Sequence, residues 1–317
     1  MKQLLLISAF LSGISIHAFS QCCSAGNPVG GDATMGLFSK NQWIINIGYK
    51  HSASDQYFHL SRKADMNIVD ESFFDYNQIS VNYGISKRLA VFAETGYFWD
   101  KTQKLTFDSS EIKIQSHGLG DLQINLRYKI IKSANPRHQL IFSGGIKLPV
   151  GAFNEEQDGI VVPVSLQPSS GALKYNVSFF YSSKKPDKKL GLSCFTLFEA
   201  SRWIEKDFLI HHYGPYLQLT PGFNYSLKKI LISAYIKYEL RGKDQRENNS
   251  IIESSGSQIL LFNPSIRFSI SGDWSFSLST DLPIFKYVYG YQLTNKYAIQ
   301  FGIRKEINRA YSVKVKD

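Results

Sequence analysis

Residues 121–130 read Asp-Leu-Gln-Ile-Asn-Leu-Arg-Tyr-Lys-Ile. Every second position of this stretch is apolar, and the positions between are polar or charged. Because successive side chains of a β-strand point to opposite faces, this period of two predicts a strand with one apolar face and one wet face. Arg127 and Lys129 then lie on the wet face, opposite Leu126 and Tyr128.

The same alternation recurs from residue 42 onward, near residues 42–50, 139–150, 174–182, 230–239, 274–281 and 297–304. In a soluble β-sandwich the apolar face would be the core, whereas in a membrane barrel it would meet lipid. Runs of about ten residues match the ~9–11 that a tilted strand needs to cross a bilayer, while sandwich strands are nearer ~5–6. Aromatic residues at strand ends, such as Trp99 and Trp274, fit the girdles at the two membrane interfaces. The pattern therefore favours a closed transmembrane β-barrel.

The links between the runs fall into two classes that alternate. Short links occur at residues 86–88, 132–138, 184–189, 228–229 and 271–273, and longer ones near residues 51–72, 100–116, 151–170, 201–213, 241–256 and 283–295. Short periplasmic turns and long extracellular loops are typical of outer-membrane barrels. Six long and five short links join about twelve strands. We predict an all-β, antiparallel up-and-down barrel of that size with both ends in the periplasm.

The amino terminus carries an export signal. Lys2 precedes an apolar run at residues 4–16, and Ala18 and Ser20 are small residues suited to cleavage after position 20. This pattern predicts a signal peptide at residues 1–20. Residues 21–41, with Cys22 and Cys23, then form a periplasmic leader and possible plug, and residues 42–317 form the barrel. The expected location is the outer membrane of a Gram-negative bacterium.

Composition disfavours other classes of protein. The mean hydropathy is -0.18, and no internal stretch approaches the ~20 apolar residues of a transmembrane helix. The net charge is +10, but the basic residues are scattered through turns and strands without a basic helix or stacking platform. Nucleic acid is therefore a poor candidate for a partner.

The polar faces of the runs define a candidate solute path through the lumen. Ionisable side chains are tolerable there only if the lumen is wet or they are paired. We expect Asp121 to pair with Arg127, and the bases outnumber the acids. The candidate lining residues are Asp121, Arg127, Lys147, Lys174, Lys237, Glu239, Arg267 and Asp281, with Lys50, Glu94, Arg304, Phe92, Phe180 and Tyr235 on the same faces.

Several short motifs resemble the "MetA pathway of phenol degradation" family of outer-membrane proteins. His-Gly-Leu-Gly-Asp-Leu at residues 117–122 resembles the family's Gly-x-Gly-Asp strand opening, and Leu-Pro-Val-Gly at residues 148–151 resembles its Leu-Pro-x-Gly element. Gln-Pro-Ser-Ser-Gly at residues 167–171 and the segment 281–293 resemble two further elements. The positions that carry the resemblance are Gly118, Gly120, Asp121, Pro149, Gly151, Pro168, Gly171, Pro283 and Gly290. The chain departs from such barrels in continuing past Ile303 to Asp317 without a terminal aromatic residue.

The resemblance implies a channel for uptake of small hydrophobic or aromatic solutes. Its expected partners are outer-membrane lipid, a small-molecule solute and the barrel-assembly machinery, with no cofactor. Two alternatives remain: a narrow porin for acidic solutes, with a continuous basic track, and a structural or adhesive barrel without transport.

Enzymatic and metal-binding functions are not expected from the residues that could suggest them. Ser116 and His117 are neighbours along a strand and would face opposite ways, which disfavours a catalytic pair. His211 and His212 make a poor metal chelate for the same geometric reason. Cys194, in a predicted strand, is expected to be an inert small side chain.

Overall fold

The computed structural model describes residues 38–66, 68–107, 110–131, 138–184, 188–206, 209–271 and 273–308. The predicted signal peptide, Cys22, Cys23 and most of the predicted leader lie outside these residues, as do residues 309–317. Among the residues described, no helix is long and apolar enough to cross a membrane.

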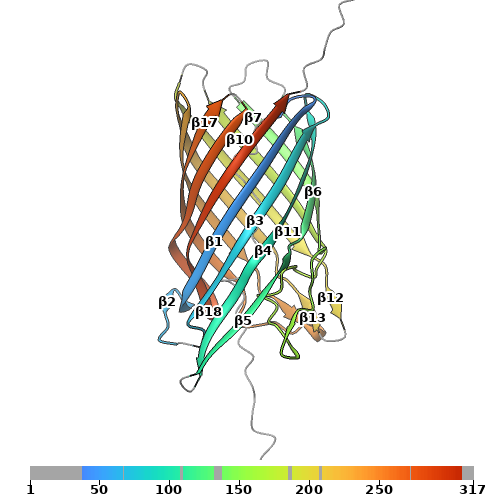
Figure 1. Ribbon diagram of the computed structural model, residues 1–317, viewed down its shortest axis with the longest axis vertical. Coiled ribbons are helices and arrows are strands. Elements are labelled where there is room, and N and C mark those ends of the chain that lie inside the picture. The colour runs from blue at the N-terminus through green and yellow to red at the C-terminus, as the bar shows by residue number, and fades with distance from the viewer. Residues whose placement is uncertain are drawn as a thin grey trace, which may run out of the picture.

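In the described part of the chain, eleven strands close into an antiparallel barrel (Figure 1). Neighbours along the wall follow chain order, as predicted for an up-and-down meander. The wall strands are β1 (Gln42–Leu60), β3 (Glu71–Gly84), β4 (Leu89–Phe107), β6 (Leu122–Lys129), β7 (His138–Leu148), β10 (Lys174–Lys184), β11 (Leu190–Ser201), β14 (Tyr216–Leu227), β15 (Ile230–Arg241), β17 (Ser257–Ser271) and β18 (Trp274–Asn308).

The last of these strands, β18, crosses the wall twice. It pairs with β17 through residues 274–288 and with β1 through residues 291–308. The chain doubles back at Gly290, which has a φ of 66°. The backbone N–H of Glu306 donates to the carbonyl of Asp273 at 2.8 Å, so the two arms of β18 lie side by side. Eleven strands, one making two passes, give the twelve passes that the sequence predicts.

The barrel closes where β1 meets the second arm of β18. Their ladder runs from Gln42 opposite Asn308 to Leu60 near the tip of the β18 hairpin. The barrel therefore begins and ends at the same end, which also carries the short turns. We call this the turn end and the opposite end the loop end. Because periplasmic turns are short in barrels of this kind, the expectation is that the turn end faces the periplasm.

Burial along the wall is the reverse of that in a soluble β-sandwich. The side chain of Leu126 is 57% exposed, whereas that of its neighbour Arg127 is 4% exposed. Trp99 and Trp274 are likewise exposed, as aromatic girdles would be. Exposed apolar residues around a whole barrel require lipid rather than water outside, because apolar surface leaves water favourably. This arrangement excludes the sandwich that composition left open.

The links differ from the prediction at the loop end. β1 and β4 have 19 residues each and extend into the predicted loops 51–72 and 100–116. The other elements, most of them in or beside the long links, are β2 (Arg62–Lys63), β5 (Ser110–Leu119), β8 (Glu156–Gln157), β9 (Ile160–Val161), β12 (Ile204–Lys206), β13 (Leu209–His212), β16 (Gln245–Arg246) and the 3₁₀-helix η1 (Glu247–Asn249). Backbone ladders stabilise these polar segments beyond the bilayer, where the strands need no apolar face.

Candidate functional site: the lumen of the barrel

The structure places the candidate lining residues inside the barrel. Most of them belong to three groups at different positions on the wall. Two groups are salt-bridged clusters of lysines with acids, and the third is a set of arginines around a cavity.

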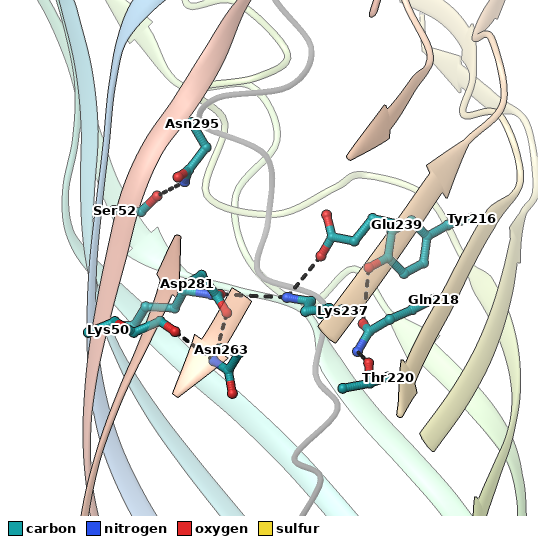
Figure 2. A network of polar contacts seen from close by, with 11 residues as sticks. Lys50, Ser52, Tyr216, Gln218, Thr220, Lys237, Glu239, Asn263, Asp281 and Asn295 are labelled. Carbon is teal, nitrogen blue, oxygen red and sulfur yellow. Dashed lines mark hydrogen bonds and ion pairs between the residues drawn. The ribbon is translucent and has the colours of Figure 1, made fainter. Parts of the chain in front are cut away.

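The first group, which we call the Asp281 cluster, has its residues on β1, β15, β17 and β18. Figure 2 shows the contacts between them. The carboxylate of Asp281 on β18 lies 3.5 Å from the Nζ of Lys50 on β1 and 3.6 Å from the Nζ of Lys237 on β15. Lys237 also contacts Glu239 at 2.9 Å. Asn263 on β17 donates to Asp281 at 2.8 Å. Two lysines and two acids therefore neutralise one another across this part of the lumen.

The second group, the Glu199 cluster, spans β7, β10 and β11. Lys147 lies 2.8 Å and Lys174 3.3 Å from the carboxylate of Glu199. Sequence analysis named both lysines but missed Glu199. The sequence signal was weak here, because Phe195 and Leu197 on the same inward face are apolar and hide the alternation.

Five positions of the family resemblance, Gly118, Asp121, Gly151, Pro168 and Gly171, lie together at the loop end. Asp121 accepts hydrogen bonds from Ser169 Oγ at 2.7 Å and from the backbone N–H of Ser170 at 2.9 Å. Lys101 on β4 donates to the carbonyl of Gln167 at 2.8 Å. These contacts hold residues 151–172, which we call the docked loop, against the buried face of the β4–β5 hairpin.

The expected ion pair between Asp121 and Arg127 was wrong. The two residues lie six positions apart along one segment of wall, which is roughly 20 Å in an extended chain. Asp121 instead binds the docked loop, and Arg127 donates to Asn82 at 3.1 Å. Residues that share a face of one strand need not be near enough to pair.

Close packing explains two glycines of the resemblance. A Cβ at Gly151 would lie 1.7 Å from the carbonyl oxygen of Leu119, and a Cβ at Gly118 would lie 3.2 Å from the ring of Pro168. Gly118 also has a φ of 146°. Any side chain at these positions would push the docked loop off the wall. Of the remaining positions, Gly120 lies against Tyr76, Gly171 against Phe153, Pro149 just after β7, Pro283 opposite Leu261 and Gly290 at the β18 turn.

The third group surrounds a cavity nearer the turn end, which we call the arginine cavity. The cavity has a volume of about 70 Å³ and is partly open to solvent. Arg127 on β6, Arg267 on β17 and Arg304 on β18 line it together with Glu94 and Phe92. The guanidinium of Arg127 stacks on the Phe92 ring, 3.7 Å from its centroid.

Two acids lie close to these arginines. Arg304 contacts Glu306 at 2.9 Å, and Glu94 accepts a hydrogen bond from Gln78 at 2.7 Å. The lining itself holds three arginines and one acid, so its net charge is +2 (3 − 1).

A second hollow, the outer groove, lies on the outer face of the wall where β1, β17 and β18 meet. Its lining is almost wholly apolar and includes Phe268, Phe276 and Phe301. On the inner face of the same wall segment, Gly48 of β1 pairs with Gly302 of β18, and Ser277 of the other β18 arm hydrogen-bonds the Gly302 carbonyl. The outer groove and the arginine cavity share five lining residues: Ile47, Gly48, Ser277, Gly302 and Ile303.

Apolar side chains also line part of the lumen itself. One buried cluster consists of Phe38, Ala90, Ile141, Phe180, Phe195, Leu197 and Tyr216. Phe38 precedes β1 and is 3% exposed, so the first described residue of the predicted leader packs inside the barrel. Sequence analysis named Phe180 in this region but neither Phe38 nor Phe195.

The remaining sequence candidates have structural contacts. Ser116 is buried and donates to the carbonyl of Leu166, whereas His117 is exposed. His211 lies 3.4 Å from the carboxylate of Asp244, and His212 stacks on Trp203. Cys194 is a half-buried free thiol. The members of each pair therefore point apart, as the alternation predicts.

Fold and inverted burial together define the chain as a transmembrane β-barrel of the bacterial outer-membrane type. No protein-family model matches the chain, and no curated protein matches it. The resemblance to the phenol-degradation family therefore stays a prediction.

Solved structures resemble the barrel at low sequence identity. The COG4313 outer membrane channel from Pseudomonas putida F1 has a TM-score of 0.70 and 10% identity, covering 89% of this chain and 100% of that one. A mutant of the TodX monoaromatic hydrocarbon channel (TM-score 0.48, 9% identity, 86% and 91% covered) and the KdgM porin (TM-score 0.44, 9% identity, 82% and 98% covered) are more distant. At this sequence identity the similarity to the COG4313 channel supports the fold alone. The other two similarities are too low to support a conclusion.

Proposed function

We propose that the protein is an outer-membrane channel for uptake of small hydrophobic or aromatic solutes. One observation carries the proposal: the arginine cavity inside the barrel and the apolar outer groove share the thin wall segment of Gly48, Ser277 and Gly302. An apolar solute in the lumen is therefore separated from an apolar surface outside by residues that have almost no side chain.

Two further features support this function over its alternatives. The buried cluster around Phe180 and Phe195 supplies apolar lining within the lumen. Lys147 and Lys174 both pair with Glu199, and Lys237 pairs with Glu239 and Asp281. A porin for acidic solutes would need a continuous basic track, and these ion pairs interrupt it.

The proposal assigns transport and not catalysis to the chain. Barrel-assembly machinery remains an expected partner on the general ground that such barrels must be inserted into the membrane.

Uptake by intact cells tests the proposal. Gram-negative cells that express the barrel should accumulate radiolabelled naphthalene faster than cells without it. Gly302→Val should abolish the gain, because the new side chain fills the thin wall segment and displaces only the Ser277 hydroxyl, 2.6 Å from the new Cβ.

Gly144→Val is the matched control. Gly144 lies on β7, and the nearest atoms to its Cβ belong to the Phe142 ring at 3.6 Å, so the same substitution leaves the thin wall segment intact. Both variants are checked for the heat-modifiable migration of a folded barrel. Equal uptake by cells with and without the barrel would refute the proposed function and favour a structural or adhesive barrel.

A further inference from the structure

The arginine cavity has a composition that a channel for neutral hydrocarbons does not require. Three guanidinium groups reach it, one from β6 and two from the neighbouring strands β17 and β18. Elsewhere in the lumen the lysines contact nearly equal numbers of acids. Two lysines share one acid in the Glu199 cluster, and the arginine cavity is a second position with more bases than acids, near the turn end.

Glu94 and Glu306 offset part of this charge, but the three guanidinium groups still outnumber the two acids beside them. Like charges in a partly enclosed site repel one another, and a further anion lowers that repulsion. Guanidinium is the cation best suited to this role, because its planar fork of donors matches a carboxylate with two parallel hydrogen bonds. The arrangement is therefore suited to an anionic group that arrives with the solute.

The rest of the cavity is not suited to a wholly polar anion. On one side it reaches Ile47, Ile303 and the thin wall segment, behind which the outer groove begins. An apolar body directed at this side would leave little water-exposed hydrocarbon, which is favourable in proportion to the area removed from water. A charged head and an apolar body are thus both accommodated in one site.

We propose that the arginine cavity binds small amphipathic carboxylic acids, with the carboxylate on Arg127, Arg267 and Arg304 and the apolar body toward Gly48, Gly302 and Ile303. This inference rests on the proposed function and names its solute class: aromatic or aliphatic monocarboxylic acids. The cavity is then a binding site on the uptake path, at the point where a solute leaves the lumen.

Isothermal titration calorimetry on the full-length mature barrel, refolded in detergent, tests the inference without a transport assay. The probes are benzoate, its neutral counterpart benzyl alcohol, and inorganic phosphate as an anion without an apolar body. Benzoate should bind more tightly than either. The benzyl alcohol titration also measures the partition of an aromatic ring into the detergent micelle. The heat of benzoate binding must exceed that background.

Arg267→Gln should weaken benzoate binding by about tenfold, because one charged hydrogen-bond donor is lost. Arg267→Lys keeps the positive charge but lacks the planar fork of donors. Its affinity for benzoate should therefore lie between those of the wild type and of Arg267→Gln. Arg304→Gln repeats the test on a different strand should Arg267→Gln fail to fold. Arg62→Gln, an exposed arginine of β2 at the loop end, is the matched control and should bind benzoate as the wild type does.

Equal affinity for benzoate and benzyl alcohol, or unchanged benzoate binding in both folded glutamine variants, would overturn the inference. If phosphate bound as tightly as benzoate, the claim that the cavity also binds the apolar body of the acid would be overturned. The two proposals fail in different ways. Naphthalene uptake without benzoate binding would support the channel and refute the carboxylic-acid site. Benzoate binding without naphthalene uptake would support the site and refute the channel.

Discussion

Charged residues inside the barrel are arranged so that single substitutions should have unequal effects. Asp281 is the shared acid of Lys50 and Lys237, and its side chain is only 14% exposed. Replacing one member of a buried ion cluster leaves the others desolvated and without their partner, which is usually worse than removing the whole group.

Asp281→Ala should therefore lower the free energy of unfolding by about 1–3 kcal/mol. The measurement is urea unfolding of the barrel in lipid vesicles. Lys296→Met is the control, because Lys296 and Asp55 form an ion pair that is largely exposed and exposed pairs contribute little. A loss of stability no larger in Asp281→Ala than in Lys296→Met would show that lumen water solvates the lysines adequately.

An exposed side chain on the outer wall meets lipid, whereas an exposed side chain in the loops meets water. Substitution by arginine at one site of each kind distinguishes the two environments. Leu126, midway along β6, and Ile160, on β9 of the docked loop, are 57% and 73% exposed. Leu126→Arg should cost roughly 2–4 kcal/mol on folding into a bilayer, because arginine would face lipid. Ile160→Arg should change little, because Ile160 meets water. Similar costs at both sites, measured by the same urea titration, would contradict the lipid-facing wall.

At the scale of elements, the docked loop is attached to the wall by a small number of polar contacts. Asp121 makes two of them, to Ser169 and Ser170. A hydrogen bond to a charged group contributes roughly 1.5–3 kcal/mol, so this one carboxylate has a large share in holding the loop.

Asp121→Ala should therefore raise the population of released loop by about tenfold or more. Released loops should be cleaved faster by added protease, and single-channel conductance in planar bilayers should rise. Glu156→Ala removes an exposed acid from the same loop and serves as control. If Asp121→Ala were as protease-resistant as this control, other contacts, such as that of Lys101 with Gln167, would be holding the loop.

At the scale of the whole molecule, the distribution of charge predicts where ion selectivity arises. The Asp281 cluster has two lysines and two acids, and the Glu199 cluster has two lysines on one acid. The lining of the arginine cavity has three arginines and one acid and therefore the larger positive excess. Selectivity in a pore follows the charges that line it, so the turn end should dominate.

Arg267→Glu should reduce the preference for anions, measured as the reversal potential of refolded barrels in a salt gradient, with little loss of stability. Lys147→Glu should act differently, because it places a second carboxylate where Lys147 now lies 2.8 Å from Glu199. Repulsion should then destabilise the barrel. The opposite result, selectivity governed by Lys147 and not by Arg267, would place the selective region at the Glu199 cluster.

The sequence by itself determined the class of fold and the face on which each side chain lies. Alternation is a local property of an extended backbone, so the stretch from Asp121 to Ile130 already assigns Leu126 to lipid and Arg127 to the lumen. The alternation of short and long links predicted an up-and-down meander of twelve passes, because each link reverses the direction of the chain. None of this depends on which strands finally meet.

Only the tertiary structure decided which inward side chains come together. Closure of the barrel sets the height of each strand against its neighbours, and that register joins Lys147 to Glu199 and Lys50 to Asp281. It also folds the docked loop onto Asp121 and gathers Arg127, Arg267 and Arg304 around one cavity. The alternation of side chains specifies whether each one points inward or outward. It does not specify the position of a strand along the barrel axis or which residues of other strands lie beside it. The physical reason is that register is fixed by hydrogen bonds between segments far apart in the sequence.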